Sequence, residues 1–193
     1  MLDLSATFAE FPVLMTERFI LRPFRESDAE AILAYMSNPA VTKYLPSPTM
    51  THIEEALARI ERNQQLYKDQ EAVIWGIATR DTDTIIGNCL LFSFQSEHFR
   101  AEVGYSLSAD YWRKGVATEV VSRTLDYAFN ETELHSVYAN IDPRNEASQY
   151  LLEKLGFVKE AHFKEDYFDA KTQTFTDTAI YSMLRQKWLQ RKL

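Results

Sequence analysis

One stretch of the sequence places two cations, a glycine and small residues at the start of an amphipathic helix. It reads Tyr111-Trp112-Arg113-Lys114-Gly115-Val116-Ala117-Thr118-Glu119 and follows a predicted strand. The first N–H groups of a helix lack partners within it, and together with the helix dipole they attract an anion. Arg113 and Lys114 add charge suited to a pyrophosphate, and Gly115 allows close approach to the backbone. A solvated turn whose glycine only relieves strain explains the stretch equally well.

A second junction leads from another predicted strand into a helix. It reads Asp142-Pro143-Arg144-Asn145-Glu146-Ala147-Ser148. Asn145 is a typical N-cap residue, and Ser148 lies about one turn into the helix. A cap and a helix-surface serine are the simplest interpretation. A functional site is favoured because two such junctions, one basic and one polar, occur together with Glu102 on the strand before the first.

Several familiar sites are missing from the sequence. It contains no G-x-x-x-x-G-K-[ST], G-x-G-x-x-G, H-E-x-x-H or G-x-S-x-G motif. The four histidines are far apart and lack metal-ligand spacing, so no metal site is predicted. The single cysteine, Cys89, lies in an apolar strand and is interpreted as a small buried residue rather than a nucleophile. It cannot form an internal disulfide, so a reducing compartment is expected.

The elements that must position these motifs predict one α/β (or α+β) domain over residues 1–193. Seven strands are predicted, at residues 18–22, 73–78, 85–94, 101–107, 137–141, 157–168 and 175–184. Ser27 with Glu30, and Thr51 with Glu54, form capping-box patterns before two helices. Further helices are expected at 115–129 and 145–156. Because helices separate the strands in one half and hairpins join them in the other, a mixed sheet is predicted.

Composition and charge narrow the function classes. Of the 193 residues 46% are apolar, and 21 Lys or Arg against 28 Asp or Glu give a net charge of −7. This composition excludes a disordered or collagen-like chain, and the acidic balance suits a cationic substrate better than nucleic acid. No apolar run approaches the ~20 residues that span a bilayer, and an acid stands where a signal peptide carries basic residues. A cytoplasmic protein without membrane contact is expected.

Taken together, the motifs resemble the GCN5-related N-acetyltransferase (GNAT) family, and specifically the branch that acetylates the N-terminal alanine or serine amine of ribosomal proteins. The resemblance extends from residue 16 to residue 188. Its most specific parts are residues 101–107, residues 112–119, and Asn145-x-x-Ser148 followed by Leu155-Gly156-Phe157. The sequence departs from the wider superfamily twice. Trp112 replaces the usual Gln or Arg, and Leu152 stands where many relatives carry a tyrosine thought to protonate the leaving thiolate.

The resemblance implies a single domain with a sheet that splays apart at a site for acetyl-CoA, the co-substrate. The Leu107 backbone would pair with the pantetheine arm and polarise the thioester carbonyl, and Asn145 would hydrogen-bond the cofactor. Ser148 is the nearest substitute for the missing tyrosine. The pyrophosphate would be bound by the backbone of Arg113, Lys114, Gly115, Val116, Ala117 and Thr118.

The expected reaction needs an uncharged amine. An α-amino group has a pKa near 7.7–8.0 and is partly neutral at neutral pH. A weak base acting through water then suffices, and Glu102 fits that role if it faces the cleft. The alternative for Glu102 is an exposed strand carboxylate paired with a neighbour such as Arg100. Ser148 would donate a hydrogen bond to the departing sulfur.

The acceptor itself is left open. A basic peptide or protein N-terminus is the first expectation, and a polyamine or aminoglycoside is the alternative. A non-catalytic sensor that binds acyl-CoA is the second alternative. Segments 51–67 and 163–173 are expected to wall the acceptor cleft, the second as a loop. An exposed apolar sheet edge could support a homodimer, and the order of residues 1–15 is not predicted.

Overall fold

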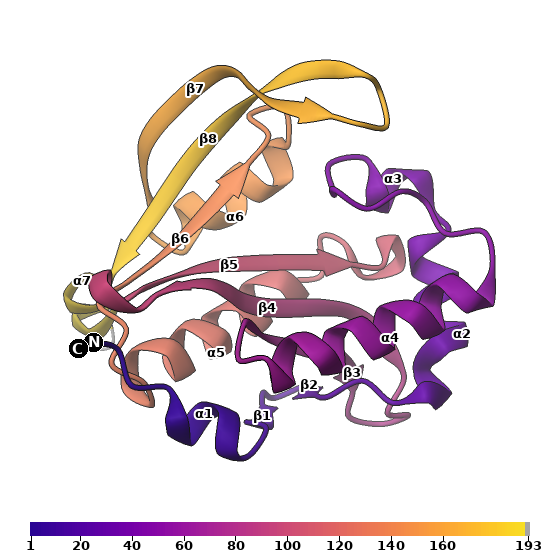
Figure 1. The fold of residues 1–193 in the computed structure, drawn as a ribbon, viewed down its shortest axis with the longest axis horizontal. Helices are drawn as coiled ribbons and strands as arrows, with labels where there is room; N and C mark the ends of the chain where they lie inside the picture. Colours follow the sequence, from indigo (N-terminus) through magenta and orange to yellow (C-terminus); the bar gives the residue numbers. More distant parts are fainter. Residues whose placement is uncertain (192–193) are drawn as a thin grey trace.

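The computed structural model describes residues 1–191, and within them eight strands form one mixed sheet (Figure 1). The strand order is β1-β2-β3-β4-β5-β6-β8-β7, and every neighbouring pair is antiparallel except β5 with β6. The sequence predicted about seven strands, and the additional one is the two-residue β1. The bounds are β1 Leu14–Met15, β2 Phe19–Arg22, β3 Ala72–Thr79, β4 Ile85–Gln95, β5 Arg100–Leu107, β6 Ser136–Ile141, β7 Val158–Asp169 and β8 Thr174–Leu184.

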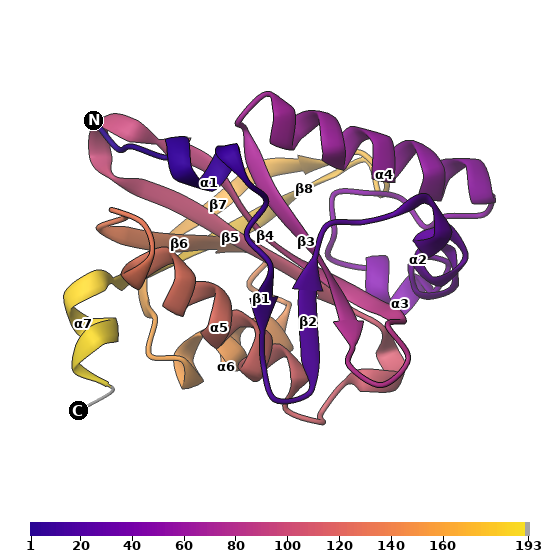
Figure 2. The same cartoon turned by 90° about the horizontal axis from the view of Figure 1, so that it is seen from below.

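Helices cover both faces of the sheet (Figure 2). Side chains of β3 alternate between the two faces, so Ile74 packs in the cluster with α2 and α4 while Trp75 packs in the cluster with α5 and α6. Covered in this way, all eight residues of β3 are buried. The helices are α1 Ser5–Ala9, α2 Ala29–Met36, α3 Pro39–Thr42, α4 Ile53–Lys68, α5 Val116–Asn130, α6 Glu146–Lys154 and α7 Arg185–Gln190.

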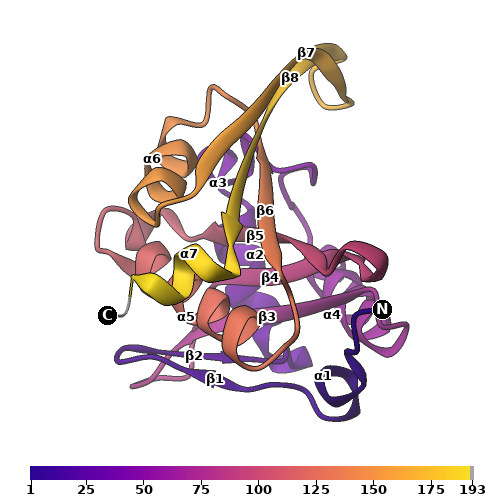
Figure 3. The ribbon, with the colours of Figure 1, turned by 90° about the vertical axis from the view of Figure 1, so that its left-hand side faces the viewer.

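The two parallel strands of the sheet part soon after they meet. β5 pairs with β6 only from Arg100 to Glu102, opposite Ser136 to Tyr138. Beyond that point β6, β8 and β7 rise away from β1 to β5 as a separate arm (Figures 1 and 3). The expected splay is therefore present, but it begins beside Glu102, five residues before Leu107. The wide end of the gap lies beside the turn that precedes α5.

Both predicted capping boxes are wrong by one or two residues. Before α2, the Asp28 carboxylate accepts the Arg25 N–H at 2.8 Å, in place of the predicted Ser27 and Glu30 pair. Asp28 is held there by the buried Arg22 guanidinium, with both oxygens within 2.9 Å of its nitrogens.

Before α4, the acid that caps the helix is the neighbour of the predicted one. Glu55, not Glu54, accepts the N–H groups of Thr51 and His52, at 2.6 and 2.8 Å. His52 rather than Thr51 is consequently the N-cap residue. Only Thr51 with Glu54 satisfies the sequence pattern, but in the structure the side chain of Glu55 turns back to the N–H groups of Thr51 and His52.

The N-terminal segment is part of the fold. Helix α1 packs against α4 and α5, where Thr7 accepts the Tyr67 hydroxyl through its carbonyl at 2.8 Å and the Tyr127 hydroxyl through its side chain at 2.9 Å. The Leu2 N–H donates to the Ser96 carbonyl at 2.9 Å. In the part of the chain that the structure describes, none of the helices has the length and apolar character to cross a membrane.

Candidate active site

The turn before α5 has the shape of an anion-binding site. Arg113 and Gly115 adopt positive φ angles of 60° and 76°, which reverse the chain and start the helix at Val116. The first helical hydrogen bond runs from the Glu119 N–H to the Gly115 carbonyl at 3.1 Å. The N–H groups of Val116, Ala117 and Thr118 therefore belong to the open first turn, where an anion is favoured.

An arginine from the opposite end of the chain holds this turn from behind. Arg18, just before β2, donates from Nη1 to the Lys114 carbonyl at 3.1 Å and from Nε to the Glu119 carboxylate at 2.7 Å. Glu119 also accepts the Arg18 N–H at 3.0 Å. Since the Lys114 carbonyl is bonded to Arg18, it does not face an anion in the turn. No local pattern in the sequence connects Arg18 to the turn, so its role could not be predicted from the residues around it.

The backbone of Leu107 faces the gap between β5 and β6. The Ser108 N–H donates to the Ile86 carbonyl at 2.7 Å, and Leu107 stands opposite Gly87. Because hydrogen-bonded and non-hydrogen-bonded pairs alternate along an antiparallel ladder, the N–H and carbonyl of Leu107 point away from β4. The Trp112 indole donates to that carbonyl at 2.8 Å. The N–H remains directed at the gap, and Trp112 ties the turn to the strand end.

Glu102 lies at the closed end of the gap and is half-buried. Its carboxylate accepts the Asn140 N–H at 3.3 Å. Burial raises the pKa of Glu102 above its ordinary value, and the interactions with Asn140, Tyr138 and Arg100 offset only part of the effect. The alternative of an exposed carboxylate paired with Arg100 fits only in part: Glu102 is half-buried, and the Arg100 guanidinium stacks on the Tyr138 ring, 4.1 Å from its centroid, but its charge lowers the pKa of Glu102.

At the second junction, Asn145 and Ser148 both have structural partners. Asn145 is the N-cap of α6, and its side-chain oxygen accepts the Ser148 N–H at 3.2 Å, which leaves its amide nitrogen as a donor. The Ser148 hydroxyl, on a buried residue, lies 2.7 Å from the Tyr105 hydroxyl of β5. Leu152 is fully buried in the core, so the position where many relatives carry a tyrosine only packs here.

These features place a half-buried carboxylate at the closed end, and an anion site beside the wide end, of the gap between the central strands β5 and β6. A family model described as an acetyltransferase (GNAT) domain matches residues 18–158, most of the chain. The chain belongs to the GNAT family. It is an N-acetyltransferase, and acetyl-CoA is its co-substrate.

Relatives of this acetyltransferase cover nearly its whole length. The uncharacterized N-acetyltransferase YoaA of Bacillus subtilis (strain 168) is 38% identical over 177 residues, which are 92% of this chain and 99% of YoaA. The crystal structure of a GNAT-family acetyltransferase from Bacillus anthracis superposes with a TM-score of 0.81 at 27% identity, over 91% of this chain and 99% of that one.

Two further relatives have names that state an acceptor. The [ribosomal protein uS5]-alanine N-acetyltransferase of Escherichia coli (strain K12) is 26% identical over 157 residues, covering 79% of this acetyltransferase and 81% of the relative. The spermidine N(1)-acetyltransferase of Vibrio cholerae is 30% identical over 107 residues, covering 55% and 61%.

The residues of the turn fit the pyrophosphate of acetyl-CoA. Gly115 is exposed, and a Cβ atom added to it would have only the Arg18 Nη2 within 4 Å, at 3.6 Å. Arg113 and Lys114 are exposed beside it. Free N–H groups and exposed cations are the groups that bind a diphosphate.

Contacts between distant segments join the β7–β8 turn to α3, and the residues after α3 to the second junction. Residues 163–169 extend strand β7 rather than forming the predicted loop, and the turn that follows reaches α3. There the Lys171 ammonium donates to the Thr42 and Leu45 carbonyls at 2.9 and 2.5 Å. The Tyr44 hydroxyl donates to the Arg144 carbonyl at 2.9 Å. This bond connects the residues that follow α3 to the second junction.

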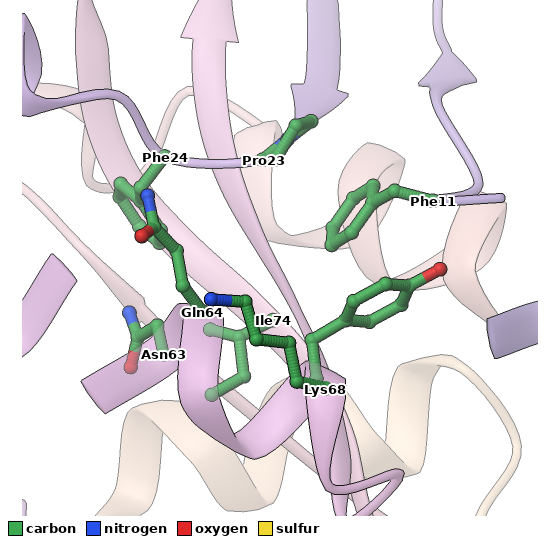
Figure 4. Close-up of a pocket in the computed structure, with 8 residues that line it drawn as sticks. Phe11, Pro23, Phe24, Asn63, Gln64, Lys68 and Ile74 are labelled. Carbon is green, nitrogen blue, oxygen red and sulfur yellow. The ribbon is translucent and has the colours of Figure 1, made fainter. Parts of the chain in front are cut away.

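A small cavity of about 230 Å³ lies away from this site, between α4, β3 and the N-terminal segment (Figure 4). None of the predicted site residues lines it, and its wall is mostly apolar. We therefore do not connect it with acetyl transfer. Its lining residues are Phe11, Pro23, Phe24, Asn63, Gln64, Tyr67, Lys68 and Ile74.

Proposed function

We propose that this enzyme acetylates the N-terminal α-amine of a protein, with a ribosomal protein as the first candidate. The observation that supports this acceptor is the environment of Glu102, a half-buried carboxylate with a raised pKa and no second titratable base beside it on β5. An α-amine, with a pKa near 7.7–8.0, is partly neutral at pH 7, whereas an alkylamine near 10.4 is almost fully charged. A single weak base is enough to deprotonate an α-amine, because part of that amine is already neutral. The uS5-alanine acetyltransferase among the relatives supports the same class.

Glu102 and Ser148 lie on opposite faces of β5. Ala101 and Val103 pack in the core cluster with α5, so Glu102, between them, points to the face that carries α2 and α4. The acceptor amine approaches Glu102 from that face, and Ser148 on α6 meets the leaving sulfur from the other.

The residues facing the gap take the remaining roles. A bound acetyl-CoA supplies an acetyl thioester. The Leu107 N–H pairs with the pantetheine arm, and the amides of residues 113–118 hold the pyrophosphate together with the Asn145 side chain. Leu107 is about 17 Å from Glu102 along an extended strand, while Tyr105, which by the same alternation also turns its N–H to the gap, is about 10 Å away. We therefore assign Tyr105 a share in polarising the thioester carbonyl.

The chemical step needs one proton acceptor. The amine nitrogen forms a bond to the carbonyl carbon, the carbon–sulfur bond breaks, and the sulfur leaves with the electron pair. Glu102 takes the surplus proton of the nitrogen through a water molecule. Ser148 donates a hydrogen bond to the sulfur and keeps its proton.

A small polyamine is the second candidate. The net charge of −7 favours a cationic acceptor, and the spermidine acetyltransferase among the relatives points to that class. The same charge suits a basic protein terminus, so charge alone does not separate the two.

The test is thiol release from acetyl-CoA with matched acceptors. A peptide that begins with Ala or Ser and continues with basic residues is compared with the same peptide blocked at its N-terminus, with spermidine and with an aminoglycoside. Turnover of the free peptide but not the blocked one supports the proposal. Turnover of spermidine or the aminoglycoside alone replaces it with the small-amine function. Binding of acetyl-CoA without turnover of any acceptor argues against the proposal and favours an acyl-CoA sensor.

A further inference from the structure

The hydroxyl groups of Tyr105 and Ser148 form a pair at the site where the sulfur would leave. Their oxygens are 2.7 Å apart, and they come from β5 and α6, 43 residues apart in the chain. Tyr105 packs against the core cluster on the α5 and α6 side, and Ser148 is 8% exposed. A hydroxyl pair this short and this sheltered has a fixed geometry.

The surroundings of the two hydroxyls favour Tyr105 as the donor and Ser148 as the acceptor of the hydrogen bond between them. Burial raises the pKa of Tyr105, so this phenol keeps its proton over the whole working range of pH. A helical serine often donates to the carbonyl four residues earlier. Here that carbonyl, of Arg144, accepts the Tyr44 hydroxyl at 2.9 Å, and the Ser148 hydroxyl pairs with Tyr105 instead. With Tyr105 donating to the Ser148 oxygen, the Ser148 hydrogen is free to point elsewhere.

We propose that Tyr105 is a positioning residue that donates to Ser148 and so directs the Ser148 hydroxyl at the sulfur of coenzyme A. The proposal rests on the role given to Ser148 under the proposed function. It also accounts for the fully buried Leu152: a phenol is supplied from β5 instead of from that helix position.

The consequence is a more stable thiolate. A hydroxyl that accepts one hydrogen bond becomes a stronger donor of the next, so the chain from Tyr105 through Ser148 strengthens the bond to a negatively charged sulfur. Hydrogen bonding to the charged form lowers a pKa, and the thiol of bound coenzyme A is therefore expected to be more acidic than the free thiol. Neither Tyr105 nor Ser148 loses its proton.

The test titrates the thiol of coenzyme A bound to the full-length protein, by the ultraviolet absorbance of the thiolate relative to the protein alone. Cys89, the only protein thiol, does not interfere because burial raises its pKa to about 12. The variants are Tyr105→Phe, Ser148→Ala and the double variant. Tyr150→Phe is the control, since this tyrosine lies two residues beyond Ser148 on α6 and is 69% exposed.

The wild-type complex should show a lowered thiol pKa, and each single variant should raise it by about half a unit to one unit. The double variant should equal Ser148→Ala, because the Tyr105 hydroxyl acts only through Ser148, and Phe leaves the Tyr105 backbone N–H in place. The kcat should fall about three- to ten-fold with an unchanged KM for acetyl-CoA, since the lost interaction belongs to the transition state. Tyr150→Phe should match the wild type in every measurement.

Three results would overturn the proposal. A wild-type thiol pKa in the Tyr105→Phe complex would leave Tyr105 a packing residue only. Additive effects in the double variant would mean that the two hydroxyls act separately, and a larger effect of Tyr105→Phe than of Ser148→Ala would place Tyr105 itself against the sulfur. The thiol titration uses no acceptor, so an incorrect acceptor assignment leaves its outcome intact.

Discussion

The Arg18 guanidinium lies 2.7 Å from the Glu119 carboxylate, although 101 residues separate the two along the chain. The same side chain holds the Lys114 carbonyl at 3.1 Å. Arg18 thus connects the start of β2 to the first turn of α5, and it keeps a carbonyl oxygen away from the position that a pyrophosphate would occupy.

Replacing Arg18 by Ala should weaken acetyl-CoA binding. The ion pair is partly exposed, so its loss is worth about 0.5–1 kcal/mol, which corresponds to a two- to five-fold higher KM for acetyl-CoA. The kcat should stay unchanged because no reacting group moves. Arg80→Ala is the control, since Arg80 donates to the Thr16 and Glu17 carbonyls near the same hairpin without contacting the turn. An equal effect of both variants would show that the hairpin, not the turn contact, matters.

Alanine variants of two glycines with a left-handed backbone can distinguish an effect on acetyl-CoA binding from an effect on stability. Gly115 and Gly156 have φ angles of 76° and 82°. Alanine at either position costs roughly 1–2 kcal/mol, which lowers the melting temperature by about 2–8 °C in a chain of this length. Only Gly115→Ala should also raise the KM for acetyl-CoA, because only Gly115 lies in the anion turn. Thermal unfolding and initial rates on both variants check this, and a raised KM in Gly156→Ala would contradict it.

Replacing Glu102 by Gln should lower kcat/KM by about 100-fold, the lower end of general-base effects, since the carboxylate acts through water. The carboxylate must be deprotonated to accept a proton, so kcat/KM should fall as the pH drops through the pKa of Glu102, which lies above the ordinary carboxyl range. Protonation of the acceptor amine should lower kcat/KM in the same direction. On a logarithmic plot the acid slope should thus fall from two toward one in the variant. Glu97→Gln, an exposed acid before β5, should change nothing.

The same variant has a stability signature that needs no substrate. Glu102 has a higher pKa folded than unfolded, so the folded chain binds more protons in this window and loses stability as the pH rises through it. Glu102→Gln should therefore melt at a higher temperature than the wild type at pH 7, with the difference vanishing in acid. A constant difference at all pH values would show that burial does not shift this carboxyl.

The site features that the sequence predicted are local ones. The anion turn depends on Gly115 and the residues around it, and the second junction depends on Asn145 capping its own helix; both follow from residues within one helical turn. The strands were predicted from apolar runs or alternating side chains, and the mixed sheet from the order of helices and hairpins along the chain. The two-residue β1 is too short for such a pattern.

The missed contacts all join distant segments. The Arg18–Glu119, Tyr105–Ser148 and Lys171–Thr42 contacts span 101, 43 and 129 residues, and no periodicity encodes them. The sequence shows which side chains can donate or accept hydrogen bonds, but not which of them lie close together in the fold. The packing of β5, α6 and the β7–β8 turn decides which of them meet.

The contact of Lys171 with the end of α3 predicts a role in acceptor binding. Its ammonium donates to the Thr42 and Leu45 carbonyls and so fixes the β7–β8 turn over the segment before α4. Lys171→Met keeps the length of the side chain but removes the donor. Roughly 1 kcal/mol is lost from hydrogen bonds to a charged group at an exposed site, so the acceptor KM should rise about five-fold with acetyl-CoA KM unchanged.

Hydrogen exchange of residues 39–45 should accelerate in Lys171→Met, because a tie to that segment is lost. Lys164→Met is the matched control, since Lys164 is an exposed lysine on β7 of the same hairpin. It should leave both the acceptor KM and the exchange rates at their wild-type values. Faster exchange without a change in acceptor KM would mean that the turn is anchored by Lys171 but does not border the acceptor.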